Sequence, residues 1–290
     1  MSVESLQQRT VLCGGARRHH YEGAMPLSVK TFRGGVAHYR TARGCYAVHE
    51  GDWLVINDGE RYALDFESDT PVRSTVVFFP AGWAAAVARV FREREQRLLD
   101  SPGVPGSPVE FLETVMSRDE RVIPCLRELD AACRRRRASG PWLEEKLRDL
   151  LAAMILSQRD HRARAGRLPA SRAATREELF RRVCRGRDFL GATACDAPSL
   201  TDAARVAALS PYHFQRSFTA VFGESPHAFA IRCRLEHARH LLAARRPVAD
   251  VALAVGYGSY SAFHHAFTRR FGAPPAGFAR KRRPPAEDTC

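Results

Sequence analysis

The sequence predicts an α+β fold, with a small β-barrel in the N-terminal part, a helical connector, and an all-α C-terminal domain. Three observations support this fold class: short turn-broken strands between positions 25 and 79, helical periodicity from Trp83 onward, and a C-terminal segment that occurs twice. The chain has 290 residues, 45% of them hydrophobic, which is enough for more than one buried core. We expect domains at residues 1–105, 106–171 and 172–283.

The first domain contains short strands separated by tight turns. The segment CYAVHEGDWLVINDGERYALDF, which begins at Cys45, holds three runs rich in β-branched and aromatic residues, broken at His49–Asp52 and at Asn57–Gly59. Gly, Asn and Asp provide the positive φ that such hairpins need. A further strand, RSTVVFF, ends before Pro80. Strands of this length and spacing favour a small barrel or a jelly roll.

The connector is expected to be helical. The Pro- and Gly-rich segment Ser101–Pro108 interrupts the helical pattern, which resumes as amphipathic helices over 109–136 and 142–159. A polar, basic segment near 160–173 is expected to be a linker before the next domain. One apolar stripe on the second helix is compatible with an intramolecular core or with a homodimer contact: Leu143, Leu147, Leu150, Leu151 and Met154.

Cysteine usage and the absence of targeting signals favour a cytoplasmic protein without cofactors. The eight cysteines are scattered and form no CxxC pair, which indicates reduced thiols rather than a disulfide framework or a zinc site. The N-terminal residues lack a charged and then apolar leader, and no window reaches the 18 apolar residues of a membrane span.

Positive charge is concentrated in the C-terminal domain. Residues 172–283 contain 18 Arg and one Lys against eight acidic residues, a net charge of +11 out of +13 for the whole chain. Such asymmetry indicates a polyanionic partner for this domain.

The same domain contains an internal repeat. The segment VAALSPYHFQRSFTAVFG, which begins at Val206, aligns with VGYGSYSAFHHAFTRRFG, which begins at Val255, at an offset of 49 residues. Each copy has a short first helix (201–208 and 248–255), a turn, a Ser at the start of a second helix, and Phe residues at i, i+4 and i+8. This is the helix-turn-helix layout, in which the second helix enters the major groove of DNA.

The outward face of each second helix follows from 100° of rotation per residue. When the Phe residues face inward, the polar side chains of the same helix face outward, and their types are those that bind base edges and phosphates. The candidate DNA-binding residues, with the serines that begin each helix, are Ser210, Tyr212, Gln215, Arg216 and Thr219 in the first copy, and Ser259, Tyr260, Ser261, His264, His265 and Arg269 in the second. A helix over 226–244 separates the copies and spans about 27 Å. One chain could therefore bind two successive major grooves.

Residues 200–280 resemble the DNA-binding domain of AraC/XylS-type transcriptional regulators. The motifs that carry the resemblance are ALSPYHFQRSFTAVFGESPHAF, RLEHARHLL and VALAVGYGSYSAFHHAFTRRFGAPPAGF. The resemblance implies a bacterial regulator that binds promoter or operator DNA and has a cupin-like N-terminal domain for a small-molecule effector. RNA polymerase and a second copy of the chain are further candidate partners. Members commonly carry Arg where this chain has His265.

The N-terminal candidates are less specific. Trp53 and Tyr62 could line an effector site, or they could be barrel core. Histidines and acids that could hold a metal do not form a ligand pattern on one strand, so we expect no metal site; they are His19, His20, His38, His49 and Glu50, with Glu236, His237 and His240 elsewhere. Asp58 and Asp65 could be paired carboxylates, but nothing in the sequence places a nucleophile or a proton partner near them. The alternative function is a metal-dependent cupin enzyme that carries a DNA-binding tail.

Overall fold

Helix α6 (Ala173–Ala192) contains the boundary between the two units of the chain. In the computed structural model, residues 1–188 form one unit and residues 189–290 the other. The residues that the structure describes are 10–91, 107–117, 119–135, 140–168 and 172–280. The domain limits expected at 105 and 171 remain predictions; both of these positions, most of the Ser101–Pro108 break and part of the expected linker lie outside the described residues.

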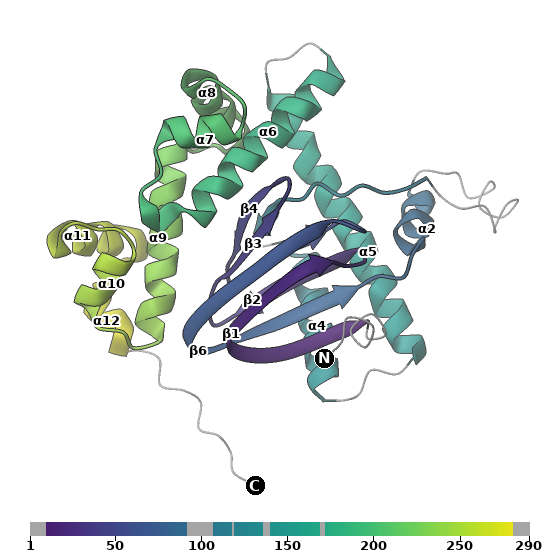
Figure 1. The fold of residues 1–290 in the computed structure, drawn as a ribbon, viewed down its shortest axis with the longest axis horizontal. Helices are drawn as coiled ribbons and strands as arrows, with labels where there is room; N and C mark the ends of the chain where they lie inside the picture. The colour runs from purple at the N-terminus through teal and green to yellow at the C-terminus, as the bar shows by residue number, and fades with distance from the viewer. Residues whose placement is uncertain (1–9, 92–106, 118, 136–139, 169–171, 281–290) are drawn as a thin grey trace, which may run out of the picture. The chain divides into compact units, whose positions relative to one another are not determined.

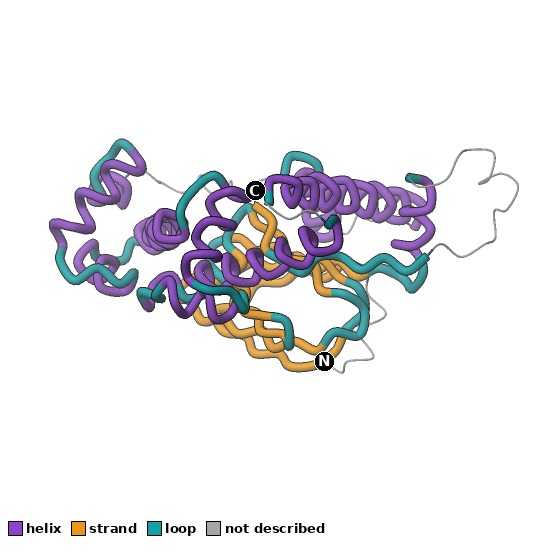
Figure 2. The backbone as a smooth tube through the Cα atoms, turned by 90° about the horizontal axis from the view of Figure 1, so that it is seen from above, coloured by secondary structure: helices purple, strands orange, loops and turns teal. Residues whose placement is uncertain are grey.

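The first unit is built on an antiparallel sheet that curves into an open barrel (Figures 1 and 2). Hydrogen-bonded neighbouring strands follow the order β4-β3-β6-β2-β5-β7, and β1 pairs with β6 in addition to this series. The long β6 pairs with β3 along its first part and with β2 along its last part. The strands are β1 (Val11–Ala24), β2 (Ser28–Arg33), β3 (Ala37–Thr41), β4 (Gly44–Val48), β5 (Asp52–Ile56), β6 (Arg61–Phe78) and β7 (Val115–Ser117).

Two features of the sheet differ from the sequence prediction. Strand β1 was not expected, because its sequence VLCGGARRHHYEGA is rich in Gly and in charged residues. It forms a strand because it pairs with β6 along nearly the whole of that strand, with a register shift between Ala16 and Arg18. The strands expected at YALDF and RSTVVFF are one continuous strand, because β1 pairs with it both before and after Pro71, while β3 and then β2 pair with its other edge.

The sheet buries side chains on both faces. Alternate residues of β5 show this, since Leu54 and Ile56 belong to the cluster inside the barrel whereas Trp53 and Val55 pack under helices. The helices on that outer face are α2 (Trp83–Val90), α4 (Val122–Arg134) and α5 (Gly140–Ala163), and a short 3-10 turn, η1 (Arg164–Arg167), follows α5.

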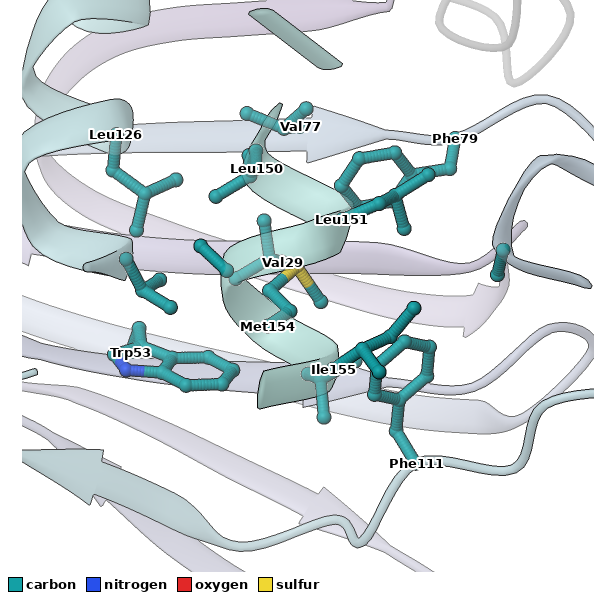
Figure 3. Close-up of a cluster of buried hydrophobic side chains, with 14 of the residues drawn as sticks. Val29, Trp53, Val77, Phe79, Phe111, Leu126, Leu150, Leu151, Met154 and Ile155 are labelled. Atoms are coloured by element: carbon teal, nitrogen blue, oxygen red, sulfur yellow. The ribbon is translucent and has the colours of Figure 1, made fainter. Parts of the chain in front are cut away.

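Helix α5 provides most of the cover on the outer face. Figure 3 shows its residues Leu150, Leu151, Met154 and Ile155 directed at the strands that carry Val29, Trp53 and Val77, among other labelled side chains. The apolar stripe on this helix is therefore part of the core of its own unit. The helix expected over 109–136 begins only at Val122, because residues 115–117 instead form β7 and pair with β5.

The second unit is helical. After a 3-10 turn, η2 (Ala194–Asp196), it contains α7 (Leu200–Val206), α8 (Pro211–Phe222), α9 (Pro226–Ala243), α10 (Val248–Ala254), α11 (Tyr260–Phe271) and α12 (Pro275–Arg280). Ser199 and Asp202 form a capping box at the start of α7. Figure 1 shows α7 and α8 toward one end of α9, with α10, α11 and α12 toward the other. Helix α9 is thus the spacer between two helix pairs.

Candidate nucleic-acid interface

Helix α8 is the second helix of the first repeat, and its two ends are fixed by local sequence. The Ser210 hydroxyl accepts a hydrogen bond from the His213 N–H at 3.3 Å, and Pro211 occupies the first helical position. The helix ends at Gly223, whose φ of 75° is the left-handed conformation that glycine adopts without strain.

Helix α11 repeats these features in the second copy. The Ser259 hydroxyl accepts from the Ala262 N–H at 3.2 Å, and the helix ends at Gly272 with φ of 70°. The first helical residue here is Tyr260 rather than Pro. Both serines are therefore N-caps in the structure, as well as candidate contacts with DNA.

The aromatic scaffold under the two helices is nearly the same. The ring centroids of Phe214 and Phe218 are 5.5 Å apart, as are those of Phe263 and Phe267. The following pairs repeat as well: Phe218–Phe222 at 4.8 Å and Phe267–Phe271 at 4.6 Å, then Phe218–Phe229 and Phe267–Phe278 both at 5.6 Å. The sequence repeat is thus a repeat of packing in three dimensions.

The two turns differ by one residue. Ala208 and Gly256 hold the positive φ of their turns, 52° and 78°, and they are 48 residues apart rather than 49. The backbone bond from Leu209 N to Ala204 O has its counterpart from Tyr257 N to Ala252 O, again at an offset of 48. The offset becomes 49 only after the inserted Gly258, so the alignment of Val206 with Val255 was wrong by one residue.

The predicted outward faces are exposed in both helices. Tyr212 is 75% exposed and Tyr260 is 51% exposed, which is high for aromatic side chains. His264 differs, because it is half-buried with its ring centroid 6.0 Å from that of Tyr260. The remaining predicted residues are also exposed, namely Ser210, Gln215, Arg216, Thr219, Ser259, Ser261, His265 and Arg269.

The arginines of this unit fall into two groups. Several are engaged by acids of the same unit: Arg232 pairs with Glu224 at 2.7 Å, and Arg239 and Arg270 both reach Glu236. By contrast, Arg216 and Arg269 on the outward faces make no ion pair within the described part of the chain. Their guanidinium groups are thus available to an external anion.

The N-terminal candidates do not gather at one place. Trp53 lies under the helices on the outer face of the sheet, whereas Tyr62 lies inside the barrel. Inside with Tyr62 is a residue that the sequence prediction missed, Lys30, which is 1% exposed. The sequence does contain a sign of this placement, because side chains alternate between the two faces of β2. Lys30 therefore lies on the same face as the buried Phe32 and on the opposite face from Val29.

One of the metal candidates, His20, pairs with Asp65, a residue of the candidate carboxylate pair. His20 Nδ1 lies 2.5 Å from one Asp65 carboxylate oxygen and Arg40 lies 3.0 Å from the other. The hydrogen bond from His20, with the nearby Arg40, holds the pKa of Asp65 below its usual range. Among the residues that the structure describes, no three His, Cys, Asp or Glu side chains are placed to hold a metal ion. None of the described helices combines the length and apolar character of a membrane span.

Known proteins match the second unit. Residues 203–281 match a family model described as a helix-turn-helix domain. LumQ of Photobacterium leiognathi, described by its name as a transcriptional regulator, is 35% identical over 81 residues, or 28% of this chain and 33% of LumQ. An AraC-like transcription regulator of Streptomyces lividans is 36% identical over 83 residues, or 28% of this chain and 27% of that protein.

The matches to these curated relatives thus span a third or less of the relatives' length. Among solved structures, ToxT from Vibrio cholerae aligns over 93% of this chain and 97% of its own, with 10% identity and a TM-score of 0.37. The repeated packing of the second unit, the family match over the same residues, and the AraC-like relative lead to one conclusion. Residues 203–281 form a tandem helix-turn-helix domain of the AraC type.

Proposed function

We propose that this chain is a transcription regulator that binds promoter DNA in the bacterial cytoplasm through α8 and α11. The observation that carries the proposal is the duplicated, capped helix with an exposed polar face and an arginine that pairs with no acid among the described residues. Helix α9 has 18 residues and is about 27 Å long, close to the roughly 34 Å of one DNA turn. The two helices would thus enter successive major grooves.

The residues of α8 and α11 divide by the contacts they can make. Arg216 can donate two parallel hydrogen bonds to a guanine, and Gln215 can pair with an adenine. Arg269, Ser261 and Thr219 are suited to phosphates, and His265 can make a single hydrogen bond to a base or a phosphate. Tyr212 and Tyr260 offer hydroxyls and ring faces next to these groups.

We further propose that the barrel of the first unit binds a small-molecule effector that alters DNA binding. Support comes from the buried, aromatic inner face of the sheet, around Tyr62. An effector shifts the DNA-binding equilibrium only by its difference in affinity for the two states. Contacts with RNA polymerase and assembly into a homodimer are also expected of such a regulator.

The test uses the full-length protein. Its genomic sites are mapped by crosslinking, and a fluorescent duplex carrying a mapped site is then titrated at increasing salt. We expect a preference for this duplex over a scrambled one, and an affinity that falls steeply with salt as counterions are released. Arg216→Ala should weaken binding, whereas Arg182→Ala, on α6 and paired with Glu178, should not. Equal affinity for mapped and scrambled duplexes would refute the proposal.

A further inference from the structure

Two cysteines that are far apart in the sequence meet where α4 packs against β1. Side chains of β1 alternate between the two faces of the sheet, so Cys13 shares the face of Val11 and not that of Leu12, which lies inside the barrel. Val11 packs against the same cluster as Leu129 of α4. Cys133 lies one turn beyond Leu129, on the same side of the helix. Cys13 and Cys133 therefore point into one interface.

A hydrogen bond between the sheet and the helix fixes how the two segments are aligned. Thr75 of β6 is the cross-strand partner of Cys13, and its hydroxyl donates to Asp130 Oδ1 of α4 at 3.1 Å. Asp130 and Cys133 are three positions apart on α4, so they are neighbours on the helix surface. The thiol of Cys13 is accordingly in hydrogen-bonding contact with Cys133 as well as with Thr75.

Both thiols are reduced and open to small molecules. Cys13 and Cys133 are free cysteines and half-buried, whereas Cys184 is fully buried. Two sulfur atoms in contact need only a small side-chain rotation to reach the disulfide bond length of about 2.05 Å. In a reducing compartment, a disulfide from such a pair is transient and responds to oxidants rather than acting as a permanent staple.

We propose that Cys13 and Cys133 form a reversible oxidation site, at which a hydroperoxide converts the two thiols into a disulfide. The inference goes beyond the proposed function and does not depend on it. Among the described strands β1 pairs with β6 alone. The new bond would tie the start of this edge strand to the C-terminal turn of α4.

The reaction begins at Cys133. Burial, and then the hydrogen bond with Cys133, raise the pKa of Cys13 well above its usual range, so Cys13 keeps its proton. The sulfur of Cys133 attacks one oxygen of hydrogen peroxide and the O–O bond breaks. The leaving oxygen takes the thiol proton, and the products are a sulfenic acid on Cys133 and one water molecule.

The second step closes the disulfide. The sulfur of Cys13 attacks the sulfur of Cys133, the S–S bond forms and the S–O bond of the sulfenic acid breaks. The proton of Cys13 leaves with the hydroxyl group as a second water molecule. The two thiols thus lose two electrons in total, and these electrons reduce the peroxide to water.

The experiment uses the reduced full-length protein. It is treated with hydrogen peroxide, remaining thiols are alkylated, and peptides are mapped by mass spectrometry. We expect a peptide that joins Cys13 to Cys133 as the main cross-link, with a loss of two hydrogens that dithiothreitol reverses. The bond closes a long loop of the unfolded chain, so oxidation should also raise the Tm, by about 5 °C or more.

Variants test the pairing and the order of the steps. Cys133→Ser should abolish the cross-link and the rise in Tm. Cys13→Ser should leave a sulfenic acid on Cys133 that dimedone traps, and Cys13→Ala serves in its place if the serine variant does not fold. Cys125→Ser is the matched control, because Cys125 is a half-buried thiol of the same helix that lies near Lys146 of α5, a helix without cysteine. It should form the cross-link at the native rate.

Three outcomes would overturn the inference: no Cys13–Cys133 peptide at a peroxide dose that oxidises Cys125, cross-links spread without preference over other cysteines, or a rise in Tm that survives in Cys133→Ser. The titration with DNA tests the proposed function separately, and neither result decides the other.

Discussion

The first helix-turn-helix copy (α7 and α8) and the second (α10 and α11) can be compared position by position. Their buried Phe rings repeat with the same spacing, and the centroid distance of the first Phe pair is equal in the two copies. Their outward faces differ, since α8 presents Gln215 and Arg216 where α11 presents His264 and His265. The buried residues are thus the same in both copies, because packing requires them. The exposed residues differ at positions where a change would affect only the binding of a ligand.

The largest expected effect tests the shared scaffold. Phe218 and Phe267 are fully buried at equivalent positions, so Phe218→Ala and Phe267→Ala should each cost about 3–5 kcal/mol of local stability. The measurement is hydrogen exchange of the α8 and α11 amides by mass spectrometry. Tyr212→Ala, at an exposed ring of α8, is the control and should change exchange little. Two Phe variants with very different costs would show that the copies do not share one packing.

The next prediction breaks the symmetry at the turn. A Cβ on Gly256 would lie 2.3 Å from the Cys195 carbonyl oxygen, and the φ of 78° is unfavourable for other residues. Gly256→Ala should therefore cost about 2–4 kcal/mol and loosen α10 and α11.

In the first copy Ala208 already occupies the left-handed region, so Ala208→Gly should change stability by less than about 1 kcal/mol. Protection of the α11 amides reports on Gly256→Ala, and that of the α8 amides reports on Ala208→Gly. Unchanged protection in Gly256→Ala would mean that the backbone near Cys195 moves aside at little cost.

The sequence predicts the second unit better than the first, and the reason is physical. In α8 and α11 the caps, the Phe period and the terminal glycines all act within one helix, so local rules suffice. Strand β1 is stabilised by residues about 50 positions away on β6, and its Gly- and Arg-rich sequence gives no local sign of that.

The interior of the barrel was missed for a similar reason. Lys30 and Tyr39 stand on strands that the sequence predicts, but which face becomes the inside depends on how β6 bends between β3 and β2. Burial of a lysine is rare, so sequence reasoning assigns it to the surface. The sequence also did not reveal the one-residue difference between the two turns, because the small and apolar residues there align acceptably at an offset of either 48 or 49.

A third prediction concerns the outward faces. Arg216→Ala should cost about 1–3 kcal/mol of DNA affinity and relax base preference in one half of the site, because a guanidinium can bind guanine through two hydrogen bonds. His265→Ala should cost less at pH 8, because the imidazole is shorter and has no such fork, and His265→Arg should tighten binding. Anisotropy titrations with the mapped duplex and with base-substituted duplexes measure both effects. A larger loss for His265→Ala would assign the main recognition role to α11.

The smallest expected effect concerns the N-caps. Ser210 and Ser259 cap their helices in the same way, and replacing an N-cap serine with alanine costs about 0.5–2 kcal/mol. Pro211 presets the first φ of α8, whereas α11 begins with Tyr260, so Ser259→Ala should cost more than Ser210→Ala. Ser261→Ala, inside the first turn of α11 and without a capping role, should leave exchange unchanged. If Ser210→Ala and Ser259→Ala weaken DNA binding while amide exchange is unaffected, the hydroxyls act on phosphate rather than on the helix, and the cap would not explain why serine begins both helices.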